Sequence, residues 1–286
     1  MGTQAKSVEA KASTEAKVAT HYGRGELEAR ILAAVAREGK NPDALTALDL
    51  AAADEFHVGG LDSTQELAKH MDLSPGLRLL DVGSGIGGPA RYFADKHCCE
   101  VTGIDLTPEF VEVANNLTRR VKLNHLAGFQ LASALQLPFE PASFDRAYMI
   151  HVGMNIADKA GIFREVRRVL KPNGLFAIFD FMRMAEKPVR YPVPWAGTEE
   201  TSFVATPEDY RQDLRDAGFR IAQERPRTAF AIEFTERRIA SMPQSELPAL
   251  GLHLLMGERT PVMIQNILAM MKEGVLEPIE LIARAA

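Results

Sequence analysis

The chain has 286 residues, with 33 Lys and Arg against 38 Asp and Glu, and a formal net charge of −5 at pH 7. This length favours one large domain with extra segments over two complete domains. The 46% hydrophobic share is enough for a sizeable core. The acidic balance provides no basic footprint for nucleic acid, and no apolar run approaches the length of a membrane span. We therefore expect a globular protein that binds neither nucleic acid nor a membrane.

The two cysteines, Cys98 and Cys99, are adjacent in the sequence. They suit neither a disulfide framework nor a metal site, which need separated cysteines at defined spacings. Two adjacent cysteines with no such spacing predict a reducing, cytoplasmic setting and no bound metal. Residues 1–20 mix Ala with Lys and Glu and lack the apolar segment of a signal peptide. We expect this stretch to be a disordered tail.

Three helices are predicted before residue 75. Apolar residues recur at helical spacing from residue 25 to 38, and shorter helical stretches follow at 43–53 and 61–73. Pro75-Gly76 then interrupts the pattern. We expect residues 21–74 to form an N-terminal helical cap and residues 75–286 to form the core.

After the break, short apolar runs alternate with amphipathic stretches. Thr107-Pro108-Glu109 and Thr206-Pro207-Glu208-Asp209 have the residues that start helices. A helical, Met-rich tail is predicted over 228–274, followed by a final strand at 276–283. The other predicted strands cover residues 78–82, 100–105, 129–132, 144–151 and 175–179. This alternation predicts a doubly wound α/β fold, with a mostly parallel sheet that helices cover on both faces.

A glycine-rich turn follows the first strand of the predicted core. Gly83, Gly85 and Gly87 permit unusual backbone angles there, and the next helix directs free N–H groups at a ligand. Gly83, Gly85 and Gly88 also fit the dinucleotide pattern, so a nicotinamide or flavin cofactor is an alternative. Asp81 argues against that alternative, because a carboxylate repels a pyrophosphate and attracts an ammonium group.

Two further polar residues stand at strand ends. Asp105 ends the second strand, about twenty residues after the glycines, where a carboxylate can accept hydrogen bonds from two ribose hydroxyls. Dinucleotide enzymes also place an acid there, so Asp105 does not discriminate. His151 ends the fourth strand, at the edge of the sheet where ligands bind. It is a candidate general base near neutral pH, or a residue that orients the loop.

Four segments resemble the class I S-adenosylmethionine-dependent methyltransferases in order and spacing. Leu80 to Gly87 is similar to their first motif, and Val101 to Leu106 to their ribose-binding strand. Ser133 to Phe139 with Phe144-Asp145 is similar to the adenine loop and fourth strand, and Arg168 to Gly174 to the turn before the fifth strand. The resemblance covers residues 78–182. It implies a Rossmann-like, seven-stranded sheet with an antiparallel last strand.

Two weaker resemblances concern the remaining chain. Asp54 to Gly60 resembles the cap that precedes the core in bacterial small-molecule members of the class. A helical insertion between the last two strands resembles the layout of glycine, sarcosine and dimethylglycine methyltransferases. We expect insertions at about 183–205 and 228–275 to act as a lid and to bind substrate.

The resemblance also implies residue roles. Asp81 and the glycines would surround the methionine end of the cofactor, Asp105 would hold the ribose, and the adenine loop would hold adenine. Ser133 stands where the family often has an acid, so its bond to adenine would lack charge assistance. The implied cofactor contacts are Asp81, Gly83, Ser84, Gly85, Gly87, Asp105, Leu106, Ser133, Ala134, Leu135 and His151.

Candidate substrate contacts come from the cap and from the loops after the fourth and fifth strands. Trp195, the only tryptophan, is suited to hold a cationic amine by cation–π attraction, or to pack on the core. His57 is a candidate contact or a packing residue of the lid. The full set of candidates is His57, Met154, Asn155, Tyr191 and Trp195.

The leading hypothesis is methyl transfer from S-adenosylmethionine to a small molecule at nitrogen, oxygen or carbon, with S-adenosylhomocysteine as product. The sulfonium activates the methyl group, so the enzyme mainly aligns the acceptor and excludes water. An NAD- or FAD-dependent oxidoreductase and a non-catalytic S-adenosylmethionine-binding module are the alternatives. The expected partner is a small-molecule substrate, and the oligomeric state stays open to a homodimer.

Overall fold

The computed structural model describes residues 26–241 and 248–286, so the tail expected at residues 1–20 lies outside the described residues. A seven-stranded sheet has the order β3-β2-β1-β4-β5-β7-β6. Strands β1 to β5 are parallel, and β7 runs antiparallel to both β5 and β6. The predicted Rossmann-like sheet is confirmed. Its strands are β1 (Arg78–Val82), β2 (Glu100–Asp105), β3 (Ala127–Leu131), β4 (Phe144–Ile150), β5 (Leu170–Arg183), β6 (Phe219–Pro226) and β7 (Leu276–Ala285).

Helices cover both faces of the sheet, because successive strand residues point to opposite sides. Leu79 packs in one buried cluster with α4 (Gly60–Ala68), α5 (Gly88–His97) and α6 (Pro108–Arg120). Its neighbour Leu80 packs in the other, with α7 (Lys159–Val169) and α8 (Pro207–Asp216). These two clusters form the core and hold the strand ends in place.

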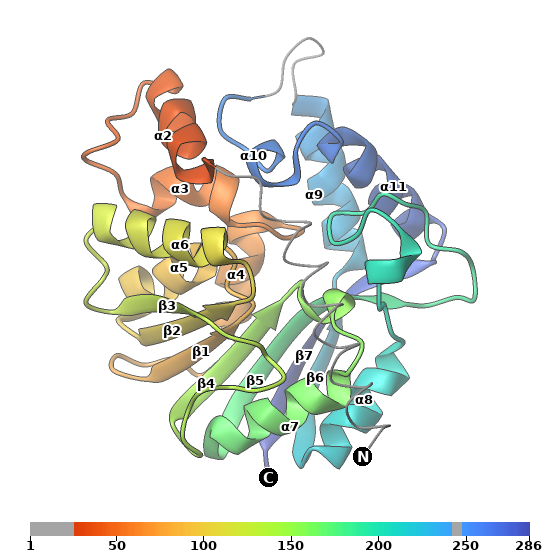
Figure 1. Cartoon of the computed structure of the whole chain (residues 1–286). Helices are drawn as coiled ribbons and strands as arrows, with labels where there is room; N and C mark the ends of the chain where they lie inside the picture. The colour runs from red at the N-terminus through yellow and green to blue at the C-terminus, as the bar shows by residue number, and fades with distance from the viewer. Residues whose placement is uncertain (1–25, 242–247) are drawn as a thin grey trace, which may run out of the picture.

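A third group of helices gathers over one end of the sheet, at the top of Figure 1. It combines segments from both ends of the chain, since Leu250, Leu254 and Leu255 pack in one cluster with the N-terminal helices. Two short turns, η1 (Gly153–Asn155) and η2 (Glu199–Thr201), lie in the loops below. The helices of this group are α2 (Leu27–Arg37), α3 (Ala47–Asp54), α9 (Thr228–Ser241), α10 (His253–Met256) and α11 (Thr260–Lys272).

The helix starts and strand bounds differ in part from expectation. Thr206 forms the predicted capping box with Asp209. Thr107 occupies the cap position of α6, but its side chain makes no capping hydrogen bond, and the backbone N–H of Thr107 instead donates to Asp105. Strand β5 begins at Leu170 rather than Leu175, because Leu170 already pairs with Phe144 before a register shift.

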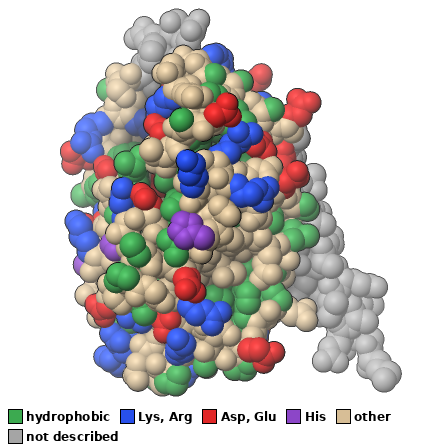
Figure 2. Space-filling view, turned by 90° about the vertical axis from the view of Figure 1, so that its left-hand side faces the viewer, with side chains coloured by type: hydrophobic (Ala, Val, Ile, Leu, Met, Phe, Trp, Pro, Cys, Tyr) green, Lys and Arg blue, Asp and Glu red, His purple; other side chains and the backbone are tan. Residues whose placement is uncertain are grey.

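The face shown in Figure 2 lies on the left of Figure 1 and mixes basic and acidic side chains, with apolar atoms between them. No helix within the described residues is long and apolar enough to cross a membrane.

A buried arginine connects the N-terminal helices to the core. Arg91 on α5 is 0% exposed, and its guanidinium donates to Asp54 Oδ2 and to the Ile86 carbonyl, both at 2.7 Å. It also donates to Thr118 Oγ1 at 3.0 Å. Burial raises the pKa of the Asp54 carboxyl, and the Arg91 charge opposes that rise. The pair therefore fixes the end of α3 against α5, α6 and the glycine-rich turn.

We expect Arg91→Met to lower the free energy of unfolding by about 3–5 kcal/mol, because it leaves the Asp54 carboxylate buried without a partner. Urea unfolding followed by circular dichroism measures this. The double variant Asp54→Leu/Arg91→Met should recover much of the loss, since neither member of the pair is left as an unpaired buried charge. Arg119→Met, on the exposed side of α6, is the control. A double variant no more stable than Arg91→Met would contradict the charge argument.

Candidate functional site

The carboxyl ends of β1, β2 and β4 border a cavity of about 110 Å³, the smaller of two at this site. The turn after β1 needs glycine, because Gly83 has a φ of 76° and a Cβ there would lie 2.4 Å from Val152 Cγ2. Gly85 has a φ of 53°, and a Cβ there would meet nothing within 4 Å. The turn is thus packed behind Gly83 and open at Gly85, where a ligand can approach the backbone.

Asp105 is fixed at the end of β2 beside this turn. Its Oδ2 accepts a hydrogen bond from the backbone N–H of Gly85 at 2.9 Å, and its Oδ1 accepts one from that of Thr107 at 2.8 Å. Burial raises the pKa of the carboxyl, while these backbone donors oppose the rise. The side chain of Thr107 and the backbone of Leu106 also interact with this carboxylate, whose two oxygens offer about four acceptor sites in all.

Three buried polar atoms that border the smaller cavity have no hydrogen-bond partner among the described residues. They are Asp81 Oδ2, Ser84 Oγ and His151 Nε2. Burial raises the pKa of Asp81 to about 8, and the charge of Asp105 adds to the rise. Unsatisfied buried groups are uncommon because each costs about 1–3 kcal/mol. Their convergence indicates a polar ligand, with a cationic or hydrogen-bond donor group near Asp81.

His57 is held from the cap by a buried network. Its Nε2 lies 3.0 Å from the Gly60 carbonyl, which can only accept, so in the neutral ring Nε2 carries the proton and Nδ1 is the acceptor. Thr64 lies 3.2 Å from the same nitrogen and donates to Glu55 at 2.6 Å. Burial lowers the pKa of His57 to about 4 and raises that of Glu55 to about 8.

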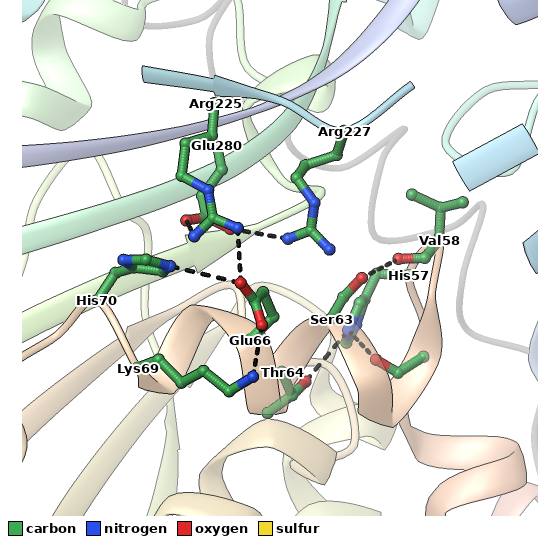
Figure 3. A network of polar contacts seen from close by, with 11 residues as sticks. His57, Val58, Ser63, Thr64, Glu66, Lys69, His70, Arg225, Arg227 and Glu280 are labelled. Atoms are coloured by element: carbon green, nitrogen blue, oxygen red, sulfur yellow. Dashed lines mark hydrogen bonds and ion pairs between the residues drawn. The ribbon is translucent and has the colours of Figure 1, made fainter. Parts of the chain in front are cut away.

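The helix that bears Thr64 is tied to the antiparallel edge of the sheet. Figure 3 shows Arg225 on β6 and Arg227, just after the end of β6, on the side of the sheet that faces α4. Arg225 bonds Glu66 at 2.7 Å, and both arginines bond the buried Glu280 at 3.2 Å. Since Lys69 also donates to Glu66, the pKa of Glu66 falls to about 2. This network anchors the segment that positions His57.

His151 faces His57 across the end of the sheet, with ring centroids 6.0 Å apart. Its φ of 56° is unusual for a residue with a side chain. The following loop is held by the buried Asp180, which accepts from the N–H groups of Val152 and Gly153 at 2.9 and 3.1 Å. Burial lowers the pKa of His151 well below its ordinary value. Burial therefore favours the neutral imidazole, and the role of His151 as a base or as an orienting residue stays a prediction.

A larger cavity of about 300 Å³ lies on the far side of the two histidines. The two cavities share Phe56, His57 and His151. Helices α9 and α11 supply much of the second wall, which is mostly apolar. Trp195 lies in this wall, 2% exposed and stacked on Phe181 with a centroid distance of 5.4 Å. The two cavities meet at His57 and His151, and the smaller one is the more polar of the two.

The structure brings most of the predicted site residues to these cavities. His57 and His151 border both, Met154 and Trp195 border the larger, and Asn155 borders the smaller while donating to the Trp195 carbonyl at 2.7 Å. Gly87, Ser133, Leu135 and Tyr191 border neither. The remaining predicted residues border the smaller cavity: Asp81, Gly83, Ser84, Gly85, Asp105, Leu106 and Ala134.

Sequence reasoning missed Phe56, Asp180 and the lining of the larger cavity. Phe234 and Arg238 border that cavity from α9, and their spacing of four residues places them on one helix face. This spacing is the sequence signal that could have identified them as residues of one cavity wall. Met256 also borders the cavity, whereas Met263 and Met270 are buried in the core. Within the described residues, no cluster of three or more His, Cys, Asp or Glu could hold a metal.

Comparison with known families identifies the domain. Residues 80–178 match the family described as the methyltransferase domain. This range coincides with the segments that resemble class I enzymes, and the strand order and the antiparallel last strand agree. Residues 80–178 therefore belong to a methyltransferase domain of the S-adenosylmethionine-dependent class.

Relatives support the domain, and each match covers less than half of the relative's own length. The chain is 35% identical over 134 residues to methyltransferase GfsG of Streptomyces halstedii, a match that covers 47% of this chain and 48% of that protein. The matches span between 29% and 48% of the length of the curated relatives.

Solved structures share the fold at low identity. Geranyl diphosphate C-methyltransferase from Streptomyces coelicolor A3(2) superposes with a TM-score of 0.64 at 15% identity, covering 78% of each chain. The cyclase SpnF superposes with a TM-score of 0.61 at 24% identity, covering 78% of this chain and 79% of that chain. This fold thus occurs in proteins named for different reactions.

We expect the buried Asp81 to make the ligand-free protein less stable as pH rises from about 4 to about 8. The folded-state pKa of about 8 lies above the ordinary value of 3.8, so the folded state binds more protons than the unfolded state in this window. Asp81→Asn should match wild type near the lower limit. For each pH unit above pH 4, the free energy of unfolding of Asp81→Asn should rise by about 1.4 kcal/mol relative to that of wild type.

Urea unfolding of wild type and Asp81→Asn across this pH range measures the difference. Asp43→Asn is the control, because the Asp43 side chain is 88% exposed. A difference between Asp81→Asn and wild type that stays constant with pH would show that the carboxyl is not buried in this way.

Proposed function

We propose that this chain, which contains a methyltransferase domain, transfers the methyl group of S-adenosylmethionine to a small molecule held in the larger cavity. The observation that carries the proposal is the junction of two cavities at His57 and His151. The smaller presents unsatisfied polar atoms, and the larger is mostly apolar. A donor and an acceptor bound on opposite sides of that junction would meet there.

The residues of the smaller cavity fit the proposed cofactor. Asp81 Oδ2 and Ser84 Oγ would receive the ammonium end, and Asp105 keeps acceptor capacity for the ribose hydroxyls. An ammonium group beside Asp81 would favour the charged carboxylate, whereas a pyrophosphate would oppose it, which argues against a dinucleotide at the same turn. Ser133 Oγ accepts from the backbone N–H of Leu135 at 3.1 Å, so its bond is local. We propose that Ala134 and Leu106 supply the apolar contacts to adenine.

The bound sulfonium supplies an already activated methyl group, so the protein must align the acceptor and keep water out. Neutral His151 has an unpaired Nε2 at the junction, and the acceptor nitrogen of His57 is its Nδ1. We propose that one of these nitrogens accepts a hydrogen bond from the acceptor, or its proton when the nucleophile is protonated. The low pKa of His151 makes positioning its first role.

We propose that the N-terminal helices and the insertions at 183–205 and 228–275 form a lid over the junction. Both cavities border residues of the cap, and α9 to α11 wall the larger one. Such a cover would shield the sulfonium and select the acceptor. The cytoplasmic location and the homodimer expected from the sequence remain part of this proposal.

Isothermal titration calorimetry with S-adenosylmethionine, followed by mass spectrometry of a panel of amines, phenols, alcohols and carboxylic acids, tests the function. We expect cofactor binding and a product heavier by one methyl group. Absence of cofactor binding by the folded protein would refute the proposal. Binding without transfer to any of the panel would favour the non-catalytic alternative.

We expect Asp105→Ala to weaken binding of S-adenosylhomocysteine by roughly 1–3 kcal/mol, because the ribose hydroxyls lose a charged acceptor in a buried site. Calorimetry measures the affinity. Circular dichroism must show an intact fold, since Asp105 also accepts from Gly85 and Thr107. Asp95→Ala, an exposed acid on α5, is the control. Unchanged affinity in Asp105→Ala would exclude the ribose assignment.

We expect His151→Asn to reduce turnover roughly tenfold while the affinity for S-adenosylhomocysteine changes little, because the acceptor loses one positioning hydrogen bond, worth about 0.5–1.5 kcal/mol. His97→Asn, remote from both cavities, is the control. Steady-state kinetics at several pH values would be compared with calorimetry. An equal fall in turnover and cofactor affinity would instead assign His151 to packing.

A further inference from the structure

An unusual cluster of positive side chains lies beside the larger cavity. Arg30 and Arg37 on α2 and Arg238 on α9 all act on His253, since their charges and burial lower the pKa of its imidazole. Arg30 also donates to the Leu254 carbonyl at 2.7 Å, beside His253. Arg238 and His253 both border the cavity itself. Four cationic or titratable side chains therefore converge at one side of a mostly apolar pocket.

None of these three arginines forms an ion pair with a carboxylate in the part of the chain that the structure describes. Other arginines do so: the adjacent Arg237 faces Glu233 at 4.0 Å, and Arg225 bonds Glu66 at 2.7 Å. Arg238 is half-buried, and burial lowers the pKa of its guanidinium. A partly desolvated guanidinium without an anion beside an apolar wall is costly, which indicates that a bound group completes it.

The position of Arg238 relative to the histidine junction follows from the packing of α9. A Cβ at Gly60 would lie 3.8 Å from Phe234 Cζ, so Phe234 lies close to the segment that holds His57. Arg238 is four residues further along the helix, about 6 Å along its axis. The backbone of Arg238 is thus about one helical turn beyond that of Phe234, and the Arg238 side chain borders the same cavity.

We propose that the larger cavity binds an amphipathic acceptor whose apolar body lies along α9 and α11 and whose anionic group pairs with Arg238. Arg30 and Arg37 would add long-range attraction. This inference rests on the proposed function, because it treats the larger cavity as the acceptor site. The planar guanidinium matches a carboxylate or a phosphate with two parallel hydrogen bonds, which are strengthened by the apolar surroundings.

Four amphiphiles with the same ten-carbon alkyl group test the proposal: decanoate, decyl phosphate, 1-decanol and decylammonium. Each is titrated, below its critical micelle concentration, into the full-length protein saturated with S-adenosylhomocysteine. The emission of Trp195 reports occupancy, since it is the only tryptophan and borders the cavity. We expect at least one anion to bind about tenfold or more tightly than both 1-decanol and decylammonium. Comparing decanoate with decyl phosphate identifies the anion class.

Arg238→Gln should abolish the preference for the anion while leaving 1-decanol affinity unchanged, and Arg238→Lys should retain part of it. Arg237→Gln is the matched control on the same helix. Equal binding of all four amphiphiles, no binding of either anion, or an unchanged preference in Arg238→Gln would overturn the proposal. Calorimetry with S-adenosylhomocysteine on the same samples separates the two proposals. Loss of cofactor binding refutes methyl transfer, whereas a missing anion preference refutes only the acceptor class.

Discussion

The buried pair between Arg91 and Asp54 is the constraint on which the rest of the site depends. Asp54 ends α3, and the segment that follows it contains Phe56 and His57, which border both cavities. Arg91 also bonds the Ile86 carbonyl within the glycine-rich turn. One guanidinium therefore sets the distance between the cap and the turn. Its charge is buried at a cost, but removing one partner is costlier still, so the arrangement persists only as a pair.

Opposite environments on the two sides of the junction follow from this arrangement. The strand ends supply backbone donors and carboxylates, because parallel strands bring their carboxyl edges together. The N-terminal cap and helices α9 to α11, which lie far apart in the sequence, supply aromatic and aliphatic side chains. Burial then changes the chemistry of the groups between them: His57 and His151 become neutral acceptors, and the pKa of Asp81 rises to about 8.

The sheet and the polar half of the site could be predicted because both depend on local order. Asp81, Gly83 and Asp105 each stand beside a strand end, so the position of the strand determines the position of the residue. The apolar half could not be predicted, because Phe56 and Phe234 come to line the same cavity only through long-range packing, which leaves no local pattern. The pKa of His151 escaped for the same reason, since Phe179 and Phe181, with ring centroids 5.0 and 4.9 Å away, belong to another strand.

The shared wall has a consequence for how two ligands occupy the protein. Phe56, His57 and His151 border both cavities, so a rearrangement of these side chains around one guest alters the room for the other. Thermodynamic linkage then requires the effect to be reciprocal: if a ligand in one cavity changes the affinity of the other cavity for its ligand, the second ligand changes the affinity for the first by the same factor. Cooperativity between the two sites therefore needs no distant relay, because the same three side chains border both cavities.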